Sequence, residues 1–266
     1  MSRNPPLLSV IVPAFNEAER IGASVERIIR FLATRADPGE LVVVDDGSTD
    51  ATFETVQRLA RNSPVPVRIF RYAPNRGKGH ALKVGFAKAR GEQLLFTDAD
   101  LSVPIEHAPT LLEPLDRGSD AAWGSRSLPD SDIAIRQPLL RQTLGATFTF
   151  LVRAFVGPVS DATCGFKAFR GSVGRELFAQ LRIYDWSFDA EILYLLRRRG
   201  YSMQEVPVSW EHREGTKVHL VRDGVRATLG LLEIRLNAAL GRYRGEHEIE
   251  PSLESWASTP QLGSSE

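Results

Sequence analysis

The chain is poor in the residues that build disulfide-rich, zinc-binding or nucleic-acid-binding proteins. Its single cysteine, Cys164, excludes an internal disulfide framework and a cysteine-rich zinc site, and it suits a reducing compartment. The 33 Lys and Arg residues balance the 33 Asp and Glu residues, so there is no global positive charge to attract nucleic acid. We therefore expect no nucleic-acid partner.

Long apolar runs are missing as well. A membrane-spanning helix needs roughly 18 or more consecutive apolar residues, and the closest candidate, 144–159, is interrupted by Arg153. Residues 1–6 are polar and proline-rich and lack the basic-then-apolar order of a secretory signal. We expect a cytoplasmic protein that is soluble or attached peripherally to the cytosolic face of a membrane.

What the chain does contain is an alternation of short apolar runs and longer amphipathic segments. This alternation predicts parallel βαβ units, whose right-handed crossovers stack helices on both faces of one sheet. The expected fold class is α/β, with a mostly parallel, twisted sheet flanked by helices. In the first half, strands are predicted at 8–12, 41–44, 67–70, 94–97 and 121–124, and helices at 21–32, after Thr49 or Asp50, at 78–89 and at 105–115.

The second half has a different pattern. It predicts helices at 139–155, 189–199 and 221–240, a short strand within 162–169 and a strand at 203–208. Residues from 246 onward are polar and rich in Ser, Glu, Gly and Pro, which predicts a disordered tail. The predicted organisation is an N-terminal tail (1–7), a nucleotide-binding half (8–126) and an acceptor-binding half (127–245) of one domain, and a C-terminal tail (246–266).

Polar and acidic groups follow three of the predicted strands. Residues 13–17 (Pro-Ala-Phe-Asn-Glu) follow the first strand, 45–48 (Asp-Asp-Gly-Ser) the second, and 98–100 (Asp-Ala-Asp) the fourth. Ligands of open parallel sheets bind at the carboxyl ends of the strands. We therefore expect the three groups to converge on one edge.

Asp98 and Asp100 flank one small residue, Ala99, and this spacing can aim two carboxylates at one hard cation. A divalent cation, Mg²⁺ or Mn²⁺, would bridge them to a diphosphate and neutralise the charge on a departing nucleotide. The pattern alone also fits a solvent-exposed turn, because Asp favours turns. Its position after an apolar strand, with two further polar clusters, favours the metal site.

The residues after the first two strands can form a nucleoside site. Asp46 can accept a hydrogen bond from a base, Phe15 can pack on that base, and Glu17 can bind a ribose hydroxyl. A turn with a helix cap, and core packing of Phe15, explain these residues nearly as well. Lys78 lies in the segment 75–79, which opens a helix and can hold an anion, although a tight turn with solvated basic residues is an equally good interpretation. This segment lacks the P-loop pattern, and 13–17 lacks the glycines of a dinucleotide-binding turn.

These motifs together resemble a known family. Segments 12–17, 43–50, 75–79 and 98–100 look like those of family 2 glycosyltransferases with a GT-A-type fold, and the likeness runs from about 9 to 243. In the second half, segments 161–169 (D-A-T-C-G-F-K-A-F), 186–191 (W-S-F-D-A-E) and 206–217 (V-P-V-S-W-E-H-R-E-G-T-K) resemble the dolichyl-phosphate glucose and mannose synthases.

The resemblance implies roles for individual residues. It implies a nucleoside site lined by Pro13, Phe15, Glu17, Val44 and Asp46. It implies a diphosphate and metal site at Asp98, Ala99 and Asp100, with phosphate contacts from Arg126, Arg213 and Lys217. Exposed salt bridges are the alternative for the basic residues. Asp161 and Asp189 would position the donor sugar or the acceptor, and shaping of a turn by Asp161 or capping of a helix by Asp189 is an equally good interpretation.

The resemblance also implies a reaction. A hexose would pass from a nucleotide sugar to a polyprenyl or dolichyl phosphate with inversion, and the ionised acceptor would need no strong general base. Ser102 stands where mannose synthases tend to carry a further metal ligand, Gln, and the segment 213–217 looks short, so UDP-glucose is favoured over GDP-mannose. The runner-up is a soluble or polysaccharide acceptor, for which Asp189 or Glu191 would serve as base. A third hypothesis is a protein that senses nucleotide sugars without catalysing a reaction. The intact pair of Asp98 and Asp100 argues against it.

A lipid acceptor would be reached at a membrane surface. The predicted helices at 139–155 and 221–240 carry apolar stripes with arginines nearby, a pattern typical of interfacial helices. Helices that face the core explain the same pattern at least as well. From the resemblance we expect a membrane surface as a partner, with a membrane protein as a further candidate.

Overall fold

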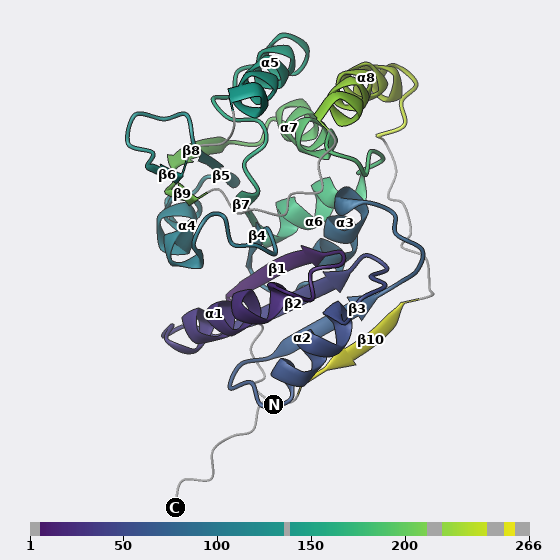
Figure 1. The fold of residues 1–266 in the computed structure, drawn as a ribbon. Coiled ribbons are helices and arrows are strands. Elements are labelled where there is room, and N and C mark those ends of the chain that lie inside the picture. The colour runs from purple at the N-terminus through teal and green to yellow at the C-terminus, as the bar shows by residue number, and fades with distance from the viewer. Residues whose placement is uncertain (1–5, 136–138, 212–219, 244–252, 259–266) are drawn as a thin grey trace, which may run out of the picture.

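An eight-stranded sheet in the order β10-β3-β2-β1-β4-β7-β5-β8 forms the centre of the fold (Figure 1). The computed structural model describes residues 6–135, 139–211, 220–243 and 253–258. The strands of this sheet are β1 (Leu8–Ala14), β2 (Gly39–Asp45), β3 (Val67–Arg71), β4 (Gln93–Thr97), β5 (Ala121–Ser125), β7 (Phe166–Arg170), β8 (Met203–Pro207) and β10 (Glu254–Ala257).

Most of the sheet is parallel, as the strand–helix alternation predicts. β3, β2, β1 and β4 are mutually parallel neighbours, and β8 is parallel to β5. β7 lies between β4 and β5 and is antiparallel to both. Because a strand from the second half of the chain separates two strands of the first half, both halves share one sheet.

Helices cover both faces of the sheet and enclose two apolar cores. α1 (Ile21–Ala33), α2 (Thr52–Ala60) and α4 (Ala108–Asp116) pack on one face, and α3 (Lys78–Lys88), α6 (Gly171–Ala179) and α7 (Phe188–Arg198) pack on the other. The predicted apolar face of α1 is confirmed, because Ile21, Val25, Ile28, Ile29 and Leu32 are all buried. The expected α/β class with helices on both faces is therefore confirmed.

α5 (Leu139–Phe155) and α8 (Leu220–Ala239) pack against each other on the α7 side of the molecule, at the top of Figure 1. On α5, Phe148, Leu151 and Phe155 pack against the second core, so the core-facing interpretation holds for these residues. Among the described residues, no helix combines the length and the apolar character needed to cross a bilayer.

Several elements differ from the prediction. Part of the tail predicted to be disordered forms β10, which pairs antiparallel with β3. β3 would otherwise leave one edge of backbone N–H and C=O groups unpaired, and the polar composition of the tail does not reveal that partner. α6 was not predicted, nor was the two-stranded sheet of β6 (Ile133–Ile135) and β9 (Trp210–Glu211). The predicted helix at 105–115 is a 3₁₀ turn, Ile105–His107, followed by α4.

Candidate active site

The loops that follow β1, β2, β4 and β5 meet at one edge of the sheet. β1 and β2 end in register, with Ala14 opposite Asp45. Because β7 is antiparallel to β4, the segment that leads into β7 reaches the same edge. The backbone N–H of Asn16 donates to Ser48 Oγ at 2.8 Å, which joins the first two loops directly. The predicted convergence of the three polar clusters is confirmed.

The loop after β1 is held by polar contacts to the next loop. Asn16 has a positive φ of 53°, and the backbone N–H of Glu17 donates to Thr52 Oγ1 at 2.7 Å. The Glu17 carboxylate forms an ion pair with Arg20, in which Arg20 Nη2 lies 2.9 Å from Glu17 Oε1. Hydrogen bonding to Glu17 raises the pKa of Arg20, and the charges of Asp98 and Asp100 raise it further. Arg20 therefore belongs to the electrostatic environment of the aspartate pair.

Asp46 anchors the loop at 75–77. Its Oδ1 accepts from the backbone N–H of Arg76 at 2.8 Å, and its Oδ2 accepts from Asn75 Nδ2 at 2.7 Å and from the backbone N–H of Gly77 at 2.9 Å. Burial raises the pKa of Asp46, although these donors oppose the shift. Its predicted contact to a base stays a prediction, and the contact that the structure shows is to this loop.

The remaining residues of the predicted nucleoside site differ in exposure. Phe15, directly after β1, is half-buried, whereas Pro13 is buried, as is Ala99 of the predicted diphosphate site. Val44 is fully buried, and a Cβ placed on Gly85 of α3 would lie 3.4 Å from Val44 Cγ2. Since the Val44 side chain belongs to the core beneath α3, any contact between this position and a nucleoside would involve its main chain.

Lys78, the first residue of α3, pairs with Asp98 at the end of β4. Lys78 Nζ lies 2.5 Å from Asp98 Oδ1, and the Asp98 side chain remains 37% exposed. Burial lowers the pKa of Lys78, but the carboxylates of Asp98 and Asp189 more than offset this and hold the pKa above its ordinary value. Asp98 also lies against Gly165, where a Cβ would fall 2.0 Å from Asp98 Oδ2. A side chain at position 165 would displace this carboxylate.

Asp100 forms part of a tight turn. Its Oδ1 accepts from the backbone N–H of Ser102 at 2.9 Å, and Leu101 between them has a positive φ of 48°. The turn interpretation and the metal interpretation are therefore compatible, because the turn uses one carboxylate oxygen. Ser102 shapes this turn, and its carbonyl accepts from the backbone N–H of Glu211 at 2.9 Å.

Arg126, which follows β5, is held by Asp161. The guanidinium donates to both Asp161 oxygens, from Nε at 2.6 Å and from Nη2 at 2.8 Å, and Nη2 also donates to Thr163 Oγ1 at 2.8 Å. Arg126 also lies over the ring of Trp210, 5.6 Å from its centroid. Burial raises the pKa of Asp161, but Arg126 more than offsets this and holds it below its ordinary value. Asp161 therefore orients Arg126, which favours the structural interpretation of Asp161.

Asp189 lies in the first turn of α7 and pairs with a buried lysine of β7. Lys167 Nζ is 2.6 Å from Asp189 Oδ1, and their side chains are 1% and 5% exposed. Burial raises the pKa of Asp189, and Lys167 and Lys78 reduce the shift. Negative and positive charges thus alternate at this edge, in the order Asp98, Lys78, Asp189 and Lys167.

Glu191 is unsuited to the role of base that the runner-up reaction would require. It is fully buried, its Oε1 accepts from the Tyr243 hydroxyl at 2.7 Å, and its Oε2 accepts from the backbone N–H groups of Arg182 and Ile183 at 3.1 and 2.8 Å. Burial raises the pKa of Glu191 to about 7. Oε2 holds the segment before α7 in place and Oε1 binds Tyr243 after α8, which favours a structural role for Glu191.

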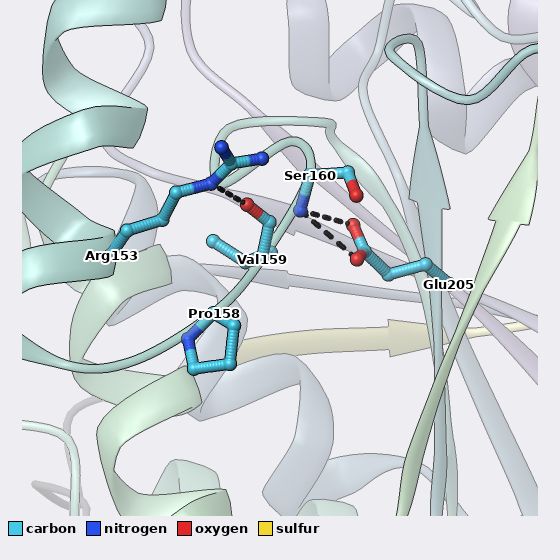
Figure 2. A pocket seen from close by; sticks show the side chains of 5 residues that line it. All are labelled: Arg153, Pro158, Val159, Ser160 and Glu205. Atoms are coloured by element: carbon cyan, nitrogen blue, oxygen red, sulfur yellow. Dashed lines mark hydrogen bonds between the residues drawn. The ribbon is translucent and has the colours of Figure 1, made fainter.

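A hollow of about 330 Å³ lies beside the loop that carries Asp161 (Figure 2). Figure 2 shows that its polar side chains bond to that loop: Glu205 of β8 accepts from the backbone N–H of Ser160 at 2.8 Å, and Arg153 of α5 donates to the carbonyl of Val159 at 2.6 Å. We therefore interpret these residues as supports for the loop that carries Asp161.

Comparison with known proteins identifies the family. A model of glycosyl transferase family 2 matches residues 9–178, which is more than half of the chain. This chain belongs to glycosyl transferase family 2. The dolichyl-phosphate beta-glucosyltransferase of Drosophila melanogaster is 37% identical over 224 residues, which cover 79% of this chain and 69% of the relative. The enzyme of the same name from Dictyostelium discoideum is 33% identical over 251 residues, which cover 89% of this chain and 76% of the relative.

A solved structure with a similar fold is that of glucosyl-3-phosphoglycerate synthase from Mycobacterium tuberculosis, in complex with Mn²⁺, uridine diphosphate and glucosyl-3-phosphoglycerate. It matches with a TM-score of 0.63 at 20% identity, over 86% of this chain and 80% of that one. At this identity the likeness concerns the fold, and the predicted GT-A-type fold is confirmed. The chain is thus a family 2 glycosyltransferase.

For this glycosyltransferase, the donor set at the Asp98–Asp100 edge fits a divalent cation. The part of the chain that the structure describes contains no group of three His, Cys, Asp or Glu side chains suited to a metal. Two carboxylates are what Mg²⁺ commonly takes from a protein when substrate phosphates and water complete its shell. Asp98 and Asp100 would therefore hold such a cation only together with a diphosphate.

Two charged residues that pair with predicted site residues of this glycosyltransferase, Arg20 with Glu17 and Lys167 with Asp189, were not predicted from the sequence. Arg20 follows Glu17 by three positions, and Lys167 stands between apolar residues of a strand. A lysine inside an otherwise apolar strand is a signal that could have been used, because a buried ammonium requires a buried anion. The predicted phosphate contacts Arg213 and Lys217 lie outside the described residues and stay predictions.

Proposed function

We propose that this glycosyltransferase transfers glucose from UDP-glucose to a polyprenyl phosphate and produces a β-linked polyprenyl phosphoglucose. The activity named for its relatives at 33% and 37% identity carries the proposal. The charges at the sheet edge support it, because Asp98 and Asp100 lie among the cations Lys78, Arg20 and Arg126. Such an edge suits a diphosphate leaving group that a divalent cation bridges to the protein.

The side chains would contribute charge and position. A divalent cation held by Asp98 and Asp100 would supply charge neutralisation for the leaving diphosphate. Lys78 would exchange its contact with Asp98 for a phosphate oxygen, and Arg126, already oriented by Asp161, would present its guanidinium to phosphate. Arg213 and Lys217 are the further phosphate contacts that we propose.

The acceptor needs little activation. A phosphate monoester is largely ionised at neutral pH, so orientation opposite the leaving group is the main requirement, and in-line attack inverts the anomeric carbon. Asp189 forms an ion pair with Lys167 and is nearly inaccessible, which suits a positioning residue better than a general base.

We further propose that α8 docks on the cytosolic face of a membrane, where a lipid-linked acceptor is available. Leu229, Leu232 and Leu236 of this helix, and Leu240 just after it, are 53–58% exposed, and Phe150 of the adjacent α5 is 68% exposed. Arg226 and Arg235 on α8 are exposed as well, and arginines beside an apolar stripe suit an anionic lipid surface. The alternative is that a membrane protein, rather than the lipid surface, covers the same leucines.

The decisive experiment uses radiolabelled sugar donors. Incubation of the full chain with labelled UDP-glucose, Mg²⁺ or Mn²⁺ and polyprenyl phosphate should move label into organic solvent. Labelled GDP-mannose should give little such product, and label that stays in water with a hydroxyl acceptor would support the runner-up reaction. The proposal fails if Asp100→Asn, prepared in parallel and shown to be folded, transfers glucose as well as the wild type.

A further inference from the structure

Trp186 lies beside the Lys78–Asp98 pair with much of its side chain exposed. It is 43% exposed, and Lys78 Nζ lies 5.9 Å from its ring centroid. The same ammonium is 2.5 Å from Asp98 Oδ1. A large aromatic ring exposed next to convergent charged groups is typical of a ligand site, because those groups orient a ligand and the ring supplies contact area.

The segment that carries Trp186 is fixed on both sides. The carbonyl of Tyr184 accepts from the backbone N–H of Gly79 at 3.0 Å, and a Cβ on Gly77 would lie 2.5 Å from that same oxygen. Glycines at these positions thus allow the segment to lie directly on the loop before α3. On the other side, Ser187 Oγ donates to the carbonyl of Ala227 in α8 at 3.2 Å. Trp186 is therefore a positioned ring between two anchored neighbours.

Trp186 comes from a different element than the residues of the proposed nucleoside site. The residues proposed for the base come from the ends of β1 and β2, whereas Trp186 enters from the segment before α7. If Asp98 and Asp100 mark the diphosphate, the group attached to its other end is the hexose. A hexose has hydroxyls around its rim, which suit the polar surroundings of the diphosphate, and C–H bonds on its faces, which suit the electron-rich face of an indole ring.

We propose that the transferred hexose of the nucleotide sugar packs against the ring of Trp186. This inference rests on the proposed function, and it adds a residue that selects the sugar-bearing donor over the free nucleotide. The alternative is that the first isoprene units of the acceptor pack against this ring. They fit less well, because the Lys78 ammonium would lose hydration against a hydrocarbon chain, whereas sugar hydroxyls replace that hydration.

Binding of UDP-glucose and of UDP, each with Mg²⁺, tests the inference by calorimetry on the full chain. Trp186→Leu should weaken UDP-glucose binding about three- to tenfold, the size of an aromatic contact, and leave UDP binding unchanged. Trp186→Phe, which keeps an aromatic face, should retain most of the affinity. Trp256→Leu on β10, at the far edge of the sheet, should change neither ligand.

Other outcomes overturn the inference in distinguishable ways. Equal weakening of UDP and UDP-glucose, or no change in either, removes Trp186 from the hexose site. A raised KM for polyprenyl phosphate with unchanged UDP-glucose binding assigns the ring to the isoprenoid instead. If the wild type binds GDP-mannose but no UDP-glucose, the proposed donor is wrong, while the ratio of GDP-mannose to GDP affinity still tests Trp186.

Discussion

Replacing Lys167 with methionine would remove the cation from a buried ion pair. Lys167 Nζ lies 2.6 Å from Asp189 Oδ1 and 4.0 Å from the centroid of the Trp123 ring, and it also donates to the carbonyl of Cys164. Methionine has a similar length and is apolar, so the change leaves little cavity. Its main effect is to leave the buried Asp189 carboxylate without its direct ion-pair partner.

The expected loss follows from that burial. Removal of one partner of a buried ion pair costs about 3–5 kcal/mol, whereas an exposed pair contributes about 0–1 kcal/mol. The pair of Lys167 and Asp189 is a buried pair, since its side chains are 1% and 5% exposed. With a urea m-value of about 3 kcal/mol/M, the unfolding midpoint of Lys167→Met should fall by about 1–2 M.

Urea unfolding followed by circular dichroism measures the effect, and the chain offers a matched control. Arg117 and Glu113 form an ion pair at 2.5 Å whose side chains are 70% and 54% exposed, so Arg117→Met should change the midpoint little. The double variant Lys167→Met with Asp189→Asn removes both charges and should recover most of the loss. The reasoning is refuted if Lys167→Met and Arg117→Met shift the midpoint equally.

Three further predictions concern other parts of the molecule. Asp100→Asn should abolish the stabilisation of the protein by UDP-glucose with Mn²⁺ in a thermal-shift assay, and an undiminished shift would remove Asp100 from the cation site. Glu191 has its folded pKa raised from 4.5 to about 7, so stability should fall as pH rises through that window, and the fall should be absent in Glu191→Gln when urea midpoints are compared. Leu232→Glu with Leu236→Glu should lower co-sedimentation with anionic lipid vesicles while transfer to a short, water-soluble polyprenyl phosphate persists. Unchanged vesicle binding by that double variant would place the membrane contact elsewhere.

Much of the first half of the fold could be predicted because its signals are local. The buried runs of β1, β2 and β4 and the apolar periodicity of α1 are properties of a few consecutive residues. Because the strands are parallel, the polar clusters that follow them had to converge on one edge. The position of Asp98 and Asp100 on that edge therefore followed from the pattern alone.

The interpretation of individual polar residues was harder, because each had a structural alternative of similar weight. The sequence fits either a substrate contact or a turn for Asp161, and its two hydrogen bonds to Arg126 favour a structural role, while a substrate contact stays a prediction. The apolar stripes of α5 and α8 looked equivalent in sequence. Packing separates them, since Phe148 of α5 joins the core while Leu232 of α8 stays exposed.

By itself the sequence determined the α/β alternation, the family and the edge at which the polar clusters converge, because local periodicity and short motifs carry that information. Only the tertiary structure decided that β7 is inserted antiparallel between β4 and β5, that β10 closes the edge of β3, and that Lys78 meets Asp98. These contacts join residues far apart in the chain. Which backbone edge or buried charge finds a partner depends on how the whole sheet packs, and no local pattern encodes it.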